Sequence, residues 1–377
     1  MNTPPSIPSW QPSRRRFVQT LTLGTGALLL PSLPSALLGA AADKTKTPDG
    51  RRKLGVALVG LGGYARGQLA PALQETEWCR LAGIVTGTPS KAEEWKRRYD
   101  LAEGNVYSYD TFERIADNPD IDIVYVVVPN GLHAEFAVRA AKAGKHVICE
   151  KPMATTVEDC DRIMAACKAA KKKLSIGYRL HFEPHNLEVM RLAQAKDFGA
   201  IKRVEAHDGY VSGGGTWRHD PKLAGGPLMD LGVYCVQAGC YATGEEPIAI
   251  TAREEKTDFE RFAKVEETIT WTMEFPSGAK AECLMSYNKN ANKLRVEAEN
   301  GWYELSPAYA YRGIAGRTSK GPMDLPQVNQ QARQMDAFAR NILDDTETIV
   351  PGDMGRRDVK IMLAIYESAR TGKRVTL

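Results

Sequence analysis

The sequence has no stripe of basic residues, no internal repeat and no pair of cysteines spaced C-x-x-C. Its formal charge is only +4 and its lysines and arginines are scattered, so nothing indicates a nucleic-acid partner. We also predict no metal site. With 377 residues the chain has room for two domains with substantial cores.

The N-terminal region lacks an unbroken apolar run. Residues 21–38 are apolar and free of acids, but two glycines and two prolines interrupt them, which argues against a membrane anchor. Arg14-Arg15-Arg16-Phe17 precedes this stretch, and small residues up to Ala42 follow it. That order is typical of a signal peptide of the twin-arginine type. We therefore predict that residues 1–42 direct a folded protein through the twin-arginine export machinery into the periplasm.

The cysteines give no disulfide framework. Cys160 and Cys167 lie seven residues apart on a predicted helix, which separates them by about 10 Å, too far for a disulfide. An odd number of cysteines without a framework indicates free, mostly buried thiols, as expected for folding in a reducing cytoplasm before export. The full set is Cys79, Cys149, Cys160, Cys167, Cys235, Cys240 and Cys283.

The chain is organised around the stretch that begins at Lys53. A short apolar run ends in Gly60-Leu61-Gly62-Gly63-Tyr64-Ala65 and passes into a segment with helical spacing. Gly60 allows the tight turn, Gly62 lets the backbone approach a diphosphate, and Ala65 lets the helix pack on the strand. A G-x-G-x-x-A match alone is weak, but its place between strand and helix patterns predicts a dinucleotide site.

Strand and helix patterns then alternate as far as residue 178. This alternation predicts an α/β Rossmann nucleotide-binding domain over residues 53–178, after a short linker at 43–52. The further predicted strands are 80–86, 106–109, 121–128, 146–149 and 174–178, and the helices are 89–99, 131–144 and 157–172.

The end of the second strand decides the cofactor. A Rossmann fold that prefers NAD usually has Asp or Glu there, to hold the ribose hydroxyls. This strand instead ends in Val85-Thr86-Gly87-Thr88-Pro89-Ser90-Lys91. Hydroxyls and a lysine suit a 2′-phosphate, so we predict NADP.

Residues 179–377 predict an α+β domain with a large, open, mostly antiparallel sheet and helices on one face. Pro276-Ser277-Gly278 is a hairpin signal. We expect the last helices to pack back on the nucleotide domain, and the open face to be the contact surface of a homodimer or homotetramer. The predicted strands are 201–211, 248–255, 265–275, 279–287, 293–299 and 302–305, and the closing helices are 327–343 and 356–370.

Two segments are expected to meet in a cleft between the domains. Lys151 stands at the carboxyl end of a parallel strand, and Pro152 permits a cis bond that would aim it into the cleft. Asp230 and Tyr234 are four residues apart and share one face of a helix. Tyrosine acts as a general acid or base where a cation lowers its pKa from about 10, and Lys151 is our candidate cation. Spacing leaves open the alternative that Tyr234 is a core residue bonded to Asp230.

Four motifs together resemble the glucose–fructose oxidoreductase branch of the Gfo/Idh/MocA family, which includes inositol dehydrogenases and dihydrodiol dehydrogenases. The resemblance covers nearly everything from Lys53 to the C-terminus. The motifs are Val59-Gly60-Leu61-Gly62-Gly63-Tyr64-Ala65, Pro129-Asn130-Gly131-Leu132-His133-Ala134-Glu135, Gly144-Lys145-His146-Val147-Ile148-Cys149-Glu150-Lys151-Pro152-Met153-Ala154-Thr155 and Leu228-Met229-Asp230-Leu231-Gly232-Val233-Tyr234.

The resemblance implies a role for individual residues. Lys151 and Tyr234 become the catalytic pair, Asp230 contacts the sugar, and Trp217 and Arg218 lie near the substrate pocket. Many relatives carry histidine in place of Tyr234, and tyrosine is the choice of this branch. The implied cofactor-binding residues are Gly60, Gly62, Gly63, Tyr64, Ala65, Thr86, Lys91, Tyr109, Pro129, Asn130, His133, Glu150, Lys151 and Arg179.

The resulting hypothesis is an NADP-dependent sugar oxidoreductase. Tyr234 takes the proton from the anomeric hydroxyl of an aldose while hydride passes to the nicotinamide, and Lys151 stabilises the tyrosinate. The product is a lactone, and the same tightly bound cofactor then reduces a second sugar to an alditol.

The alternatives are an aldose 1-dehydrogenase with dissociable NADP, an NAD-dependent glycosidase of the same family, and a non-catalytic sugar or nucleotide binder. The glycosidase usually has histidine at the Tyr234 position and an acid on the second strand. The presence of both Lys151 and Tyr234 weighs against the binder.

The chain departs from this branch before its first strand. Glucose–fructose oxidoreductase has a long proline-rich arm there, which wraps a neighbouring subunit and covers the cofactor. Only residues 43–52 occupy that place here, so the sequence does not support an arm of this kind or the tetramer that depends on it.

Overall fold

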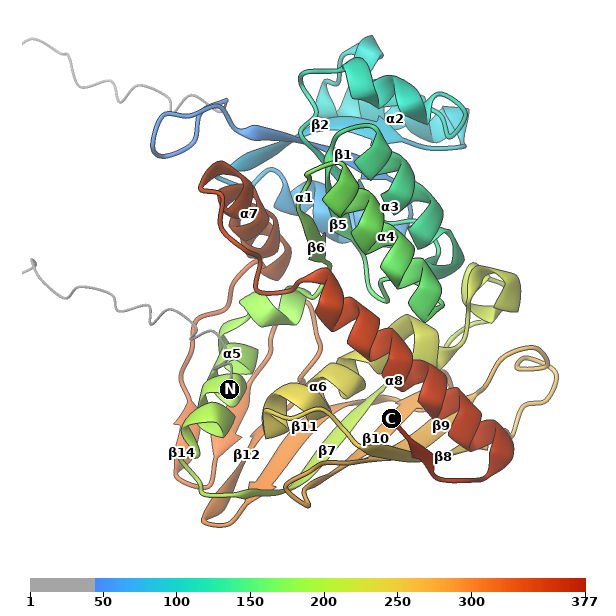
Figure 1. Cartoon of the computed structure of the whole chain (residues 1–377), viewed down its shortest axis with the longest axis vertical. Coiled ribbons are helices and arrows are strands. Elements are labelled where there is room, and N and C mark those ends of the chain that lie inside the picture. The colour runs from blue at the N-terminus through green and yellow to red at the C-terminus, as the bar shows by residue number, and fades with distance from the viewer. Residues whose placement is uncertain (1–44) are drawn as a thin grey trace, which may run out of the picture. The chain divides into compact units, whose positions relative to one another are not determined.

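The computed structural model describes residues 45–377, so the predicted signal peptide lies outside the described residues. Within 45–377, no helix combines the length and apolar character needed to cross a membrane. These residues contain two β-sheets (Figure 1).

The first sheet has six parallel strands in the order β3-β2-β1-β4-β5-β6. Its central strands are apolar and fully buried, as expected where helices cover both faces of a parallel sheet. The strand order reverses between β1 and β4, and ligands bind beyond the carboxyl ends of strands at such a point. The strands are β1 Leu54–Val59, β2 Cys79–Val85, β3 Val106–Tyr107, β4 Ile123–Val126, β5 His146–Cys149 and β6 Leu174–Ile176.

The helices between these strands follow the predicted alternation. The first begins with a π-helical turn, and short 3-10 turns precede β3, β4 and α3. The helical elements are η1 Ala65–Leu69, α1 Ala70–Ala72, α2 Pro89–Tyr99, η2 Glu103–Asn105, η3 Phe112–Asp117, η4 Asn130–Leu132, α3 His133–Lys142 and α4 Val157–Ala169.

The second sheet has nine strands in the order β14-β13-β12-β11-β7-β10-β9-β8-β15. All neighbours are antiparallel except β7 and β10, which run parallel at the centre. The predicted fold class is therefore confirmed. The strands are β7 Ile201–Gly209, β8 Ala249–Glu255, β9 Thr268–Glu274, β10 Lys280–Ser286, β11 Ala291–Ala298, β12 Gly301–Leu305, β13 Gly316–Thr318, β14 Gly321–Met323 and β15 Val375–Thr376.

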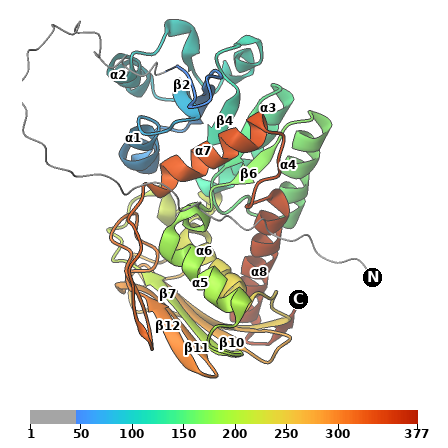
Figure 2. The ribbon, with the colours of Figure 1, turned by 90° about the vertical axis from the view of Figure 1, so that its left-hand side faces the viewer.

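Helices cover one face of the second sheet (Figures 1 and 2). Along β7 the residues alternate between buried and partly exposed, the pattern of a sheet with one covered face. On the other face, cross-strand ion pairs such as Arg203 with Glu282 and Lys293 with Glu205 join neighbouring strands. Subunit contact through this face stays a prediction. The covering helices are α5 Pro184–Ala195, α6 Val233–Thr243 and α8 Gly352–Thr371.

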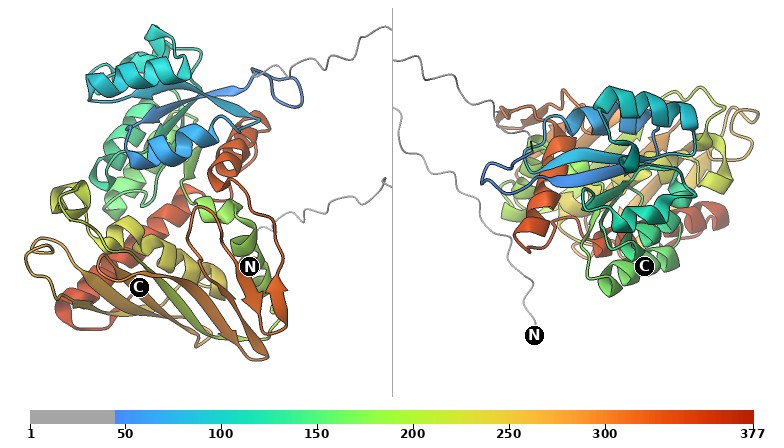
Figure 3. Two further views of the ribbon diagram at one scale, coloured as in Figure 1. Left: turned by 180° about the vertical axis from the view of Figure 1, so that it is seen from behind. Right: turned by 90° about the horizontal axis from the view of Figure 1, so that it is seen from above.

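Two C-terminal helices return toward the first sheet. The apolar side of α7 (Gln330–Leu343) shares a core with β1, since Met335 and Phe338 join the cluster of Leu54 and Val56. Figure 2 shows α7 beside the helices of the first sheet. The long α8 starts against α4 and β6 and runs on to β8, as the view from behind in Figure 3 also shows.

Several short elements escaped prediction. Strands β13, β14 and β15 have only two or three residues, too few for an alternating pattern to appear. Helix α5 also went unpredicted; Glu183 caps it by accepting a hydrogen bond from the Asn186 N–H. The hairpin at 276–278 is confirmed, because Gly278 donates to the Phe275 carbonyl and has a φ of +88°. All seven cysteines are free and buried.

Candidate active site

All of the predicted site residues except Arg179 line one cleft of about 340 Å³, a volume typical of small-molecule sites. It opens where β1, β4 and β5 end, and residues near α6 form its opposite wall. The predicted residues that line it are Gly60, Gly62, Gly63, Tyr64, Ala65, Thr86, Lys91, Tyr109, Pro129, Asn130, His133, Glu150, Lys151, Trp217, Arg218, Asp230 and Tyr234. Six lining residues had no predicted role, namely Leu61, Thr88, Val127, Val128, Leu231 and Tyr311.

The glycine loop after β1 presents bare backbone to the cleft. Gly60 has a φ of +96°, and a Cβ on it would lie 2.8 Å from the Val127 carbonyl oxygen, so the turn requires glycine. A Cβ on Gly62 or Gly63 would meet no atom within 4 Å. The first N–H groups of a helix have no partner within that helix, so this loop can receive an anionic group. Ala65 is fully buried where the helix packs down.

Hydroxyls and one ammonium line the cleft at the end of β2. Thr86, Thr88 and Lys91 lie there, and Thr86 Oγ1 accepts a hydrogen bond from the Thr88 N–H at 3.2 Å. Among the described residues, the only acids that line the cleft are Glu150 and Asp230, which follow β5 and precede α6. This end therefore suits a phosphate better than it suits ribose hydroxyls that need a carboxylate.

Two side chains predicted to bind the cofactor, His133 and Asn130, make their contacts with backbone carbonyls. His133 is 1% exposed, with Nδ1 2.7 Å from the Pro152 oxygen and Nε2 2.9 Å from the Val128 oxygen. The ring therefore lies between the loop after β4 and the loop after β5, and as a neutral imidazole with one N–H it donates to one of the two carbonyls. Burial lowers the pKa of His133 to about 4. Asn130 Nδ2 donates to the Ala224 carbonyl at 3.1 Å and joins the first wall of the cleft to the second.

Glu150 is held from behind the cleft. Its Oε1 accepts a hydrogen bond from the Tyr125 hydroxyl at 2.7 Å, and its Oε2 accepts one from the Lys151 N–H at 3.2 Å. Gln334 of α7 donates to the same tyrosine hydroxyl at 2.8 Å. Burial raises the pKa of Glu150. The end of β5 is therefore anchored to α7.

Lys151 reaches across the cleft to the second wall. The Lys151–Pro152 bond is cis. Lys151 Nζ donates to the Asp230 carbonyl at 2.6 Å and lies 3.9 Å from Asp230 Oδ1. It also lies 5.0 Å from the centre of the Tyr234 ring. The lysine and the tyrosine thus share one site, with the ammonium over the ring face.

The Tyr234 hydroxyl has neither of the expected neighbours, the Lys151 ammonium or the Asp230 carboxylate, as its hydrogen-bond partner. It accepts a hydrogen bond from Arg179 Nε at 3.1 Å, and it is not bonded to Asp230. Burial raises the pKa of Tyr234 to about 12, and the charge of Arg179 opposes that rise. The cation that lowers this pKa is therefore Arg179 and not the expected Lys151, and desolvation outweighs its effect.

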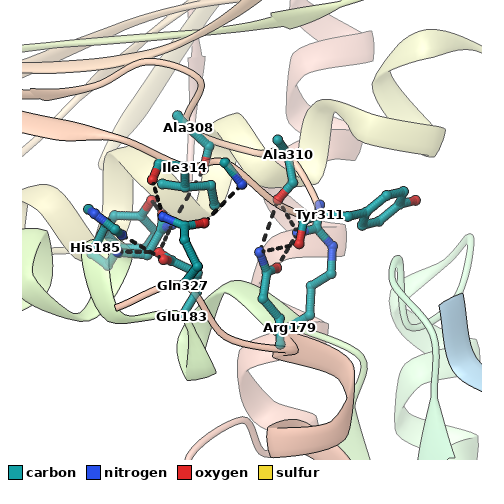
Figure 4. A network of polar contacts seen from close by, with 12 residues as sticks. Arg179, Glu183, His185, Ala308, Ala310, Tyr311, Ile314 and Gln327 are labelled. Atoms are coloured by element: carbon teal, nitrogen blue, oxygen red, sulfur yellow. Dashed lines mark hydrogen bonds and ion pairs between the residues drawn. The ribbon is translucent and has the colours of Figure 1, made fainter. Parts of the chain in front are cut away.

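The structure places Arg179 elsewhere than predicted. It does not line the cleft; its side chain is 2% exposed and lies behind Tyr234. Its guanidinium donates to the carbonyls of Tyr309 at 2.6 Å and Ala310 at 3.1 Å, and to Gln330 Oε1. Figure 4 shows Arg179 directed toward the segment that contains Ala310 and Tyr311. A cofactor-binding role for Arg179 is therefore withdrawn.

The substrate wall is built around Asp230, which lies in the π-helical turn η8 (Leu228–Gly232). Its Oδ2 accepts hydrogen bonds from Arg218 Nε at 2.7 Å and from the Tyr287 hydroxyl at 2.8 Å. The Arg218 guanidinium stacks on Trp217, 4.8 Å from the ring centre. Sequence reasoning missed Tyr287, whose only signal was its place at the end of a predicted strand.

A pair of stacked tyrosines closes one side of the cleft. Tyr64 of the glycine loop and Tyr311, from the segment after β12, have ring centres 5.7 Å apart and planes 28° apart. Tyr311 is 42% exposed. It escaped prediction because it lies in an irregular segment without periodicity.

Residues 54–178 match the oxidoreductase family with an NAD-binding Rossmann fold, and residues 186–304 match the GFO/IDH/MocA C-terminal domain. The chain belongs to the GFO/IDH/MocA oxidoreductase family. The resemblance inferred from the motifs is thereby confirmed.

Two kinds of relative of this GFO/IDH/MocA protein stand out. The crystal structure of aldose–aldose oxidoreductase from Caulobacter crescentus, complexed with glycerol, superposes with a TM-score of 0.84 and is 46% identical over 86% of this chain and all of that one. D-xylose 1-dehydrogenase [NADP(+)] of Haloarcula marismortui is 28% identical over 337 residues, covering 85% of this chain and 92% of its own. D-xylose 1-dehydrogenase (NADP(+)) 2 of Haloferax volcanii is 28% identical over 330 residues, covering 85% of this chain and 98% of its own.

The buried His133 makes the stability of this GFO/IDH/MocA protein depend on pH. Between the usual histidine pKa of 6.5 and the lowered value of about 4, the unfolded chain binds a proton that the folded chain does not. The free energy of unfolding should therefore fall as the pH drops through this window, with His146 and His181 adding to the effect. In His133→Gln the slope should be shallower, by at most about 1.4 kcal/mol per pH unit. Urea unfolding at several pH values measures it, and an unchanged slope would contradict the assignment.

Proposed function

We propose that the protein is an NADP-dependent sugar oxidoreductase that oxidises an aldose at the anomeric carbon to an aldonolactone. In the second half of the cycle it reduces another sugar to an alditol with the same cofactor molecule. The observation that carries this proposal is the meeting of the glycine loop, Lys151 and Tyr234 in a single cleft. Similarity to an aldose–aldose oxidoreductase at 46% identity supports the substrate class.

The residues along the first wall fit a dinucleotide. The bare backbone at Gly62 and Gly63 and the helix that follows suit its diphosphate. At the end of β2, Thr86 and Lys91 suit a 2′-phosphate, and the loop fixed by His133 borders the nicotinamide end. When bound, the cofactor supplies the site that accepts or donates hydride.

Tyr234 accepts and donates the proton in the proposed reaction. As a tyrosinate it takes the proton of the anomeric hydroxyl, and in the opposite direction its hydroxyl protonates the carbonyl oxygen of the second sugar. Lys151 Nζ lies beside both Tyr234 and Asp230, so it can donate to the same sugar oxygen.

The substrate wall suits a polyhydroxylated ligand. Asp230 accepts hydrogen bonds, Arg218 donates them, and the Trp217 ring offers an apolar face for the C–H side of a sugar. Asp230 is 4% exposed, and its contacts with Arg218 and Tyr287 fix its position.

Two observations support a retained cofactor. Arg14 and Arg15 precede an apolar stretch typical of export, and we propose a periplasmic location, where no NADP pool is expected. The stack of Tyr64 on Tyr311 joins the glycine loop to the second wall, and a bridge of this kind would slow dissociation. An aldose 1-dehydrogenase with exchangeable NADP remains the second candidate, because two relatives are named as NADP-dependent D-xylose dehydrogenases.

Desalted protein with no added nucleotide should convert a mixture of aldoses steadily, with aldonate and alditol formed in equal amounts. Both products follow because each hydride taken from one sugar is given to the next. Chromatography of the sugars measures the two yields, and mass spectrometry after denaturation identifies the nucleotide that the protein carries. Turnover that appears only on addition of NADP would favour the exchangeable dehydrogenase.

Lys91→Ala should weaken NADP binding at least about tenfold and leave NAD binding nearly unchanged, since it removes one partly exposed ammonium from a phosphate site. Competition titrations of the two nucleotides on apo-protein measure the ratio. Arg97→Ala, which removes an exposed charge from the same helix at a position that does not line the cleft, serves as a matched control. Equal losses for NADP and NAD would place Lys91 outside the 2′-phosphate site.

Tyr234→Phe should slow sugar oxidation by about a hundredfold or more, the usual scale for loss of a general acid–base. The variant keeps the ring and its stacking, so the fold and the bound nucleotide should stay. Single-turnover absorbance of the reduced nicotinamide measures the chemical step. A rate like that of the unmodified protein would mean that Tyr234 is a packing residue and not the acid–base.

A further inference from the structure

Arg179 is a buried cation with only neutral acceptors. Its side chain is 2% exposed, and none of the ion pairs among residues 45–377 includes it. Its guanidinium donates to two backbone carbonyls, to the amide oxygen of Gln330 and to the Tyr234 hydroxyl. The carboxyls of Glu150 and Asp208 act on Arg179 and on Tyr234 through charge alone, without a hydrogen bond to either. Burial of a charge to which no carboxylate bonds costs free energy. A group nearby that can become an anion would remove that cost.

Tyr234 is the one ionisable group among those acceptors. Arg179 Nε donates to its hydroxyl at 3.1 Å, and the guanidinium carbon lies 4.9 Å from the centre of its ring. Arginine keeps its charge over the whole range in which a tyrosine titrates. Loss of the hydroxyl proton would turn this contact into a charge-assisted hydrogen bond, the stronger kind.

The guanidinium is also held rigidly at this place. The carbonyls of Tyr309 and Ala310 and the side chain of Gln330 fix three of its donors, and the Tyr311 ring lies 4.6 Å from its carbon. A preorganised charge of this kind needs no rearrangement when the proton moves.

Lys151 is placed differently. Its ammonium donates to the Asp230 carbonyl and stands over the Tyr234 ring, and within residues 45–377 no hydrogen bond joins it to the Tyr234 hydroxyl. It lines the cleft, whereas Arg179 lies behind it. The two cations therefore approach the tyrosine from different directions.

We propose that Arg179 is a positioning residue that stabilises the tyrosinate form of Tyr234, while Lys151 acts on the substrate side of the cleft. The proposal rests on Tyr234 as the acid–base of the proposed function. Arg179 exchanges no proton and contacts no substrate; the proton moves between the sugar oxygen and Tyr234 Oη. The proposal explains why an arginine is buried at this point without a carboxylate.

The test measures the titration of Tyr234 itself. Tyrosinate absorbance is recorded against pH for each protein and for the same protein with Tyr234→Phe, and the difference isolates this residue among 14 tyrosines. Arg179→Met should raise the pKa of Tyr234 by about 1 unit or more. Arg179→Lys, which keeps the charge, should recover most of that shift, and Lys151→Met should shift the pKa less than Arg179→Met.

The pH profile of sugar oxidation gives a second readout. In Arg179→Met the part of the pH–rate profile that reports deprotonation of the base should move to higher pH by the same amount as the pKa. At a fixed pH below that pKa, kcat should therefore fall about tenfold for each pH unit of this displacement. KM for the sugar should change little, because Arg179 does not line the cleft.

Gln330→Glu tests the idea with the arginine in place, should Arg179→Met fail to fold. The new carboxylate pairs with the guanidinium and partly cancels its positive field at Tyr234, so the pKa of Tyr234 should again rise. Gln330→Met, which removes the same hydrogen bonds without adding charge, should leave that pKa close to its original value.

An unchanged Tyr234 titration in folded Arg179→Met, or in Gln330→Glu, overturns the proposal, as does a larger shift in Lys151→Met. The titration requires no sugar. If the shifts occur while desalted protein converts no sugar, the proposed function fails and the assignment of Arg179 stands.

Discussion

The return of α7 to the first sheet is the constraint on which the cleft depends. Met335 and Phe338 bury the apolar side of this helix in a core with β1, and each such side chain contributes about 1.5–3 kcal/mol when fully buried. The adjoining side carries three buried glutamines, Gln330, Gln331 and Gln334. Apolar packing thus fixes the helix and thereby places polar groups that could not hold it alone.

Each glutamine reaches a different part of the site. Gln330 accepts from Arg179 behind the tyrosine, Gln334 donates to the tyrosine that holds Glu150, and Gln331 lies 3.5 Å from the Tyr64 hydroxyl. Helix α7 therefore contacts the surroundings of Tyr234, of Lys151 and of the glycine loop. Residues 45–52 are joined to the end of the same helix, since Arg51 donates to the Leu343 carbonyl and to the Asp344 carboxylate.

The charges around Tyr234 are divided between two walls. Lys151 follows β5 and donates to the Asp230 carbonyl, while the carboxylate of Asp230 accepts hydrogen bonds from Arg218 and Tyr287. This leaves the Tyr234 hydroxyl to Arg179. A carboxylate bonded to the hydroxyl would favour the neutral tyrosine, so this partition suits the proposed role of Tyr234 as a base.

The sequence by itself determined the fold class, the glycine loop, the hydroxyl-lined end of β2 and the meeting of Lys151 with Tyr234. The first three follow from local signals, because strand and helix periods, turn residues and short motifs act over neighbouring residues. The meeting of Lys151 with Tyr234 was expected from the cleft between the domains and from the resemblance to the family. Only the tertiary structure decided the hydrogen-bond partner of the Tyr234 hydroxyl, the buried position of Arg179 behind the cleft and the stacking of Tyr64 on Tyr311. Arg179, Tyr311 and Gln330 lie in separate segments of the chain, and each has ordinary local surroundings. Their contacts arise because burial forces distant polar groups to satisfy one another, and no local pattern records which of them will meet.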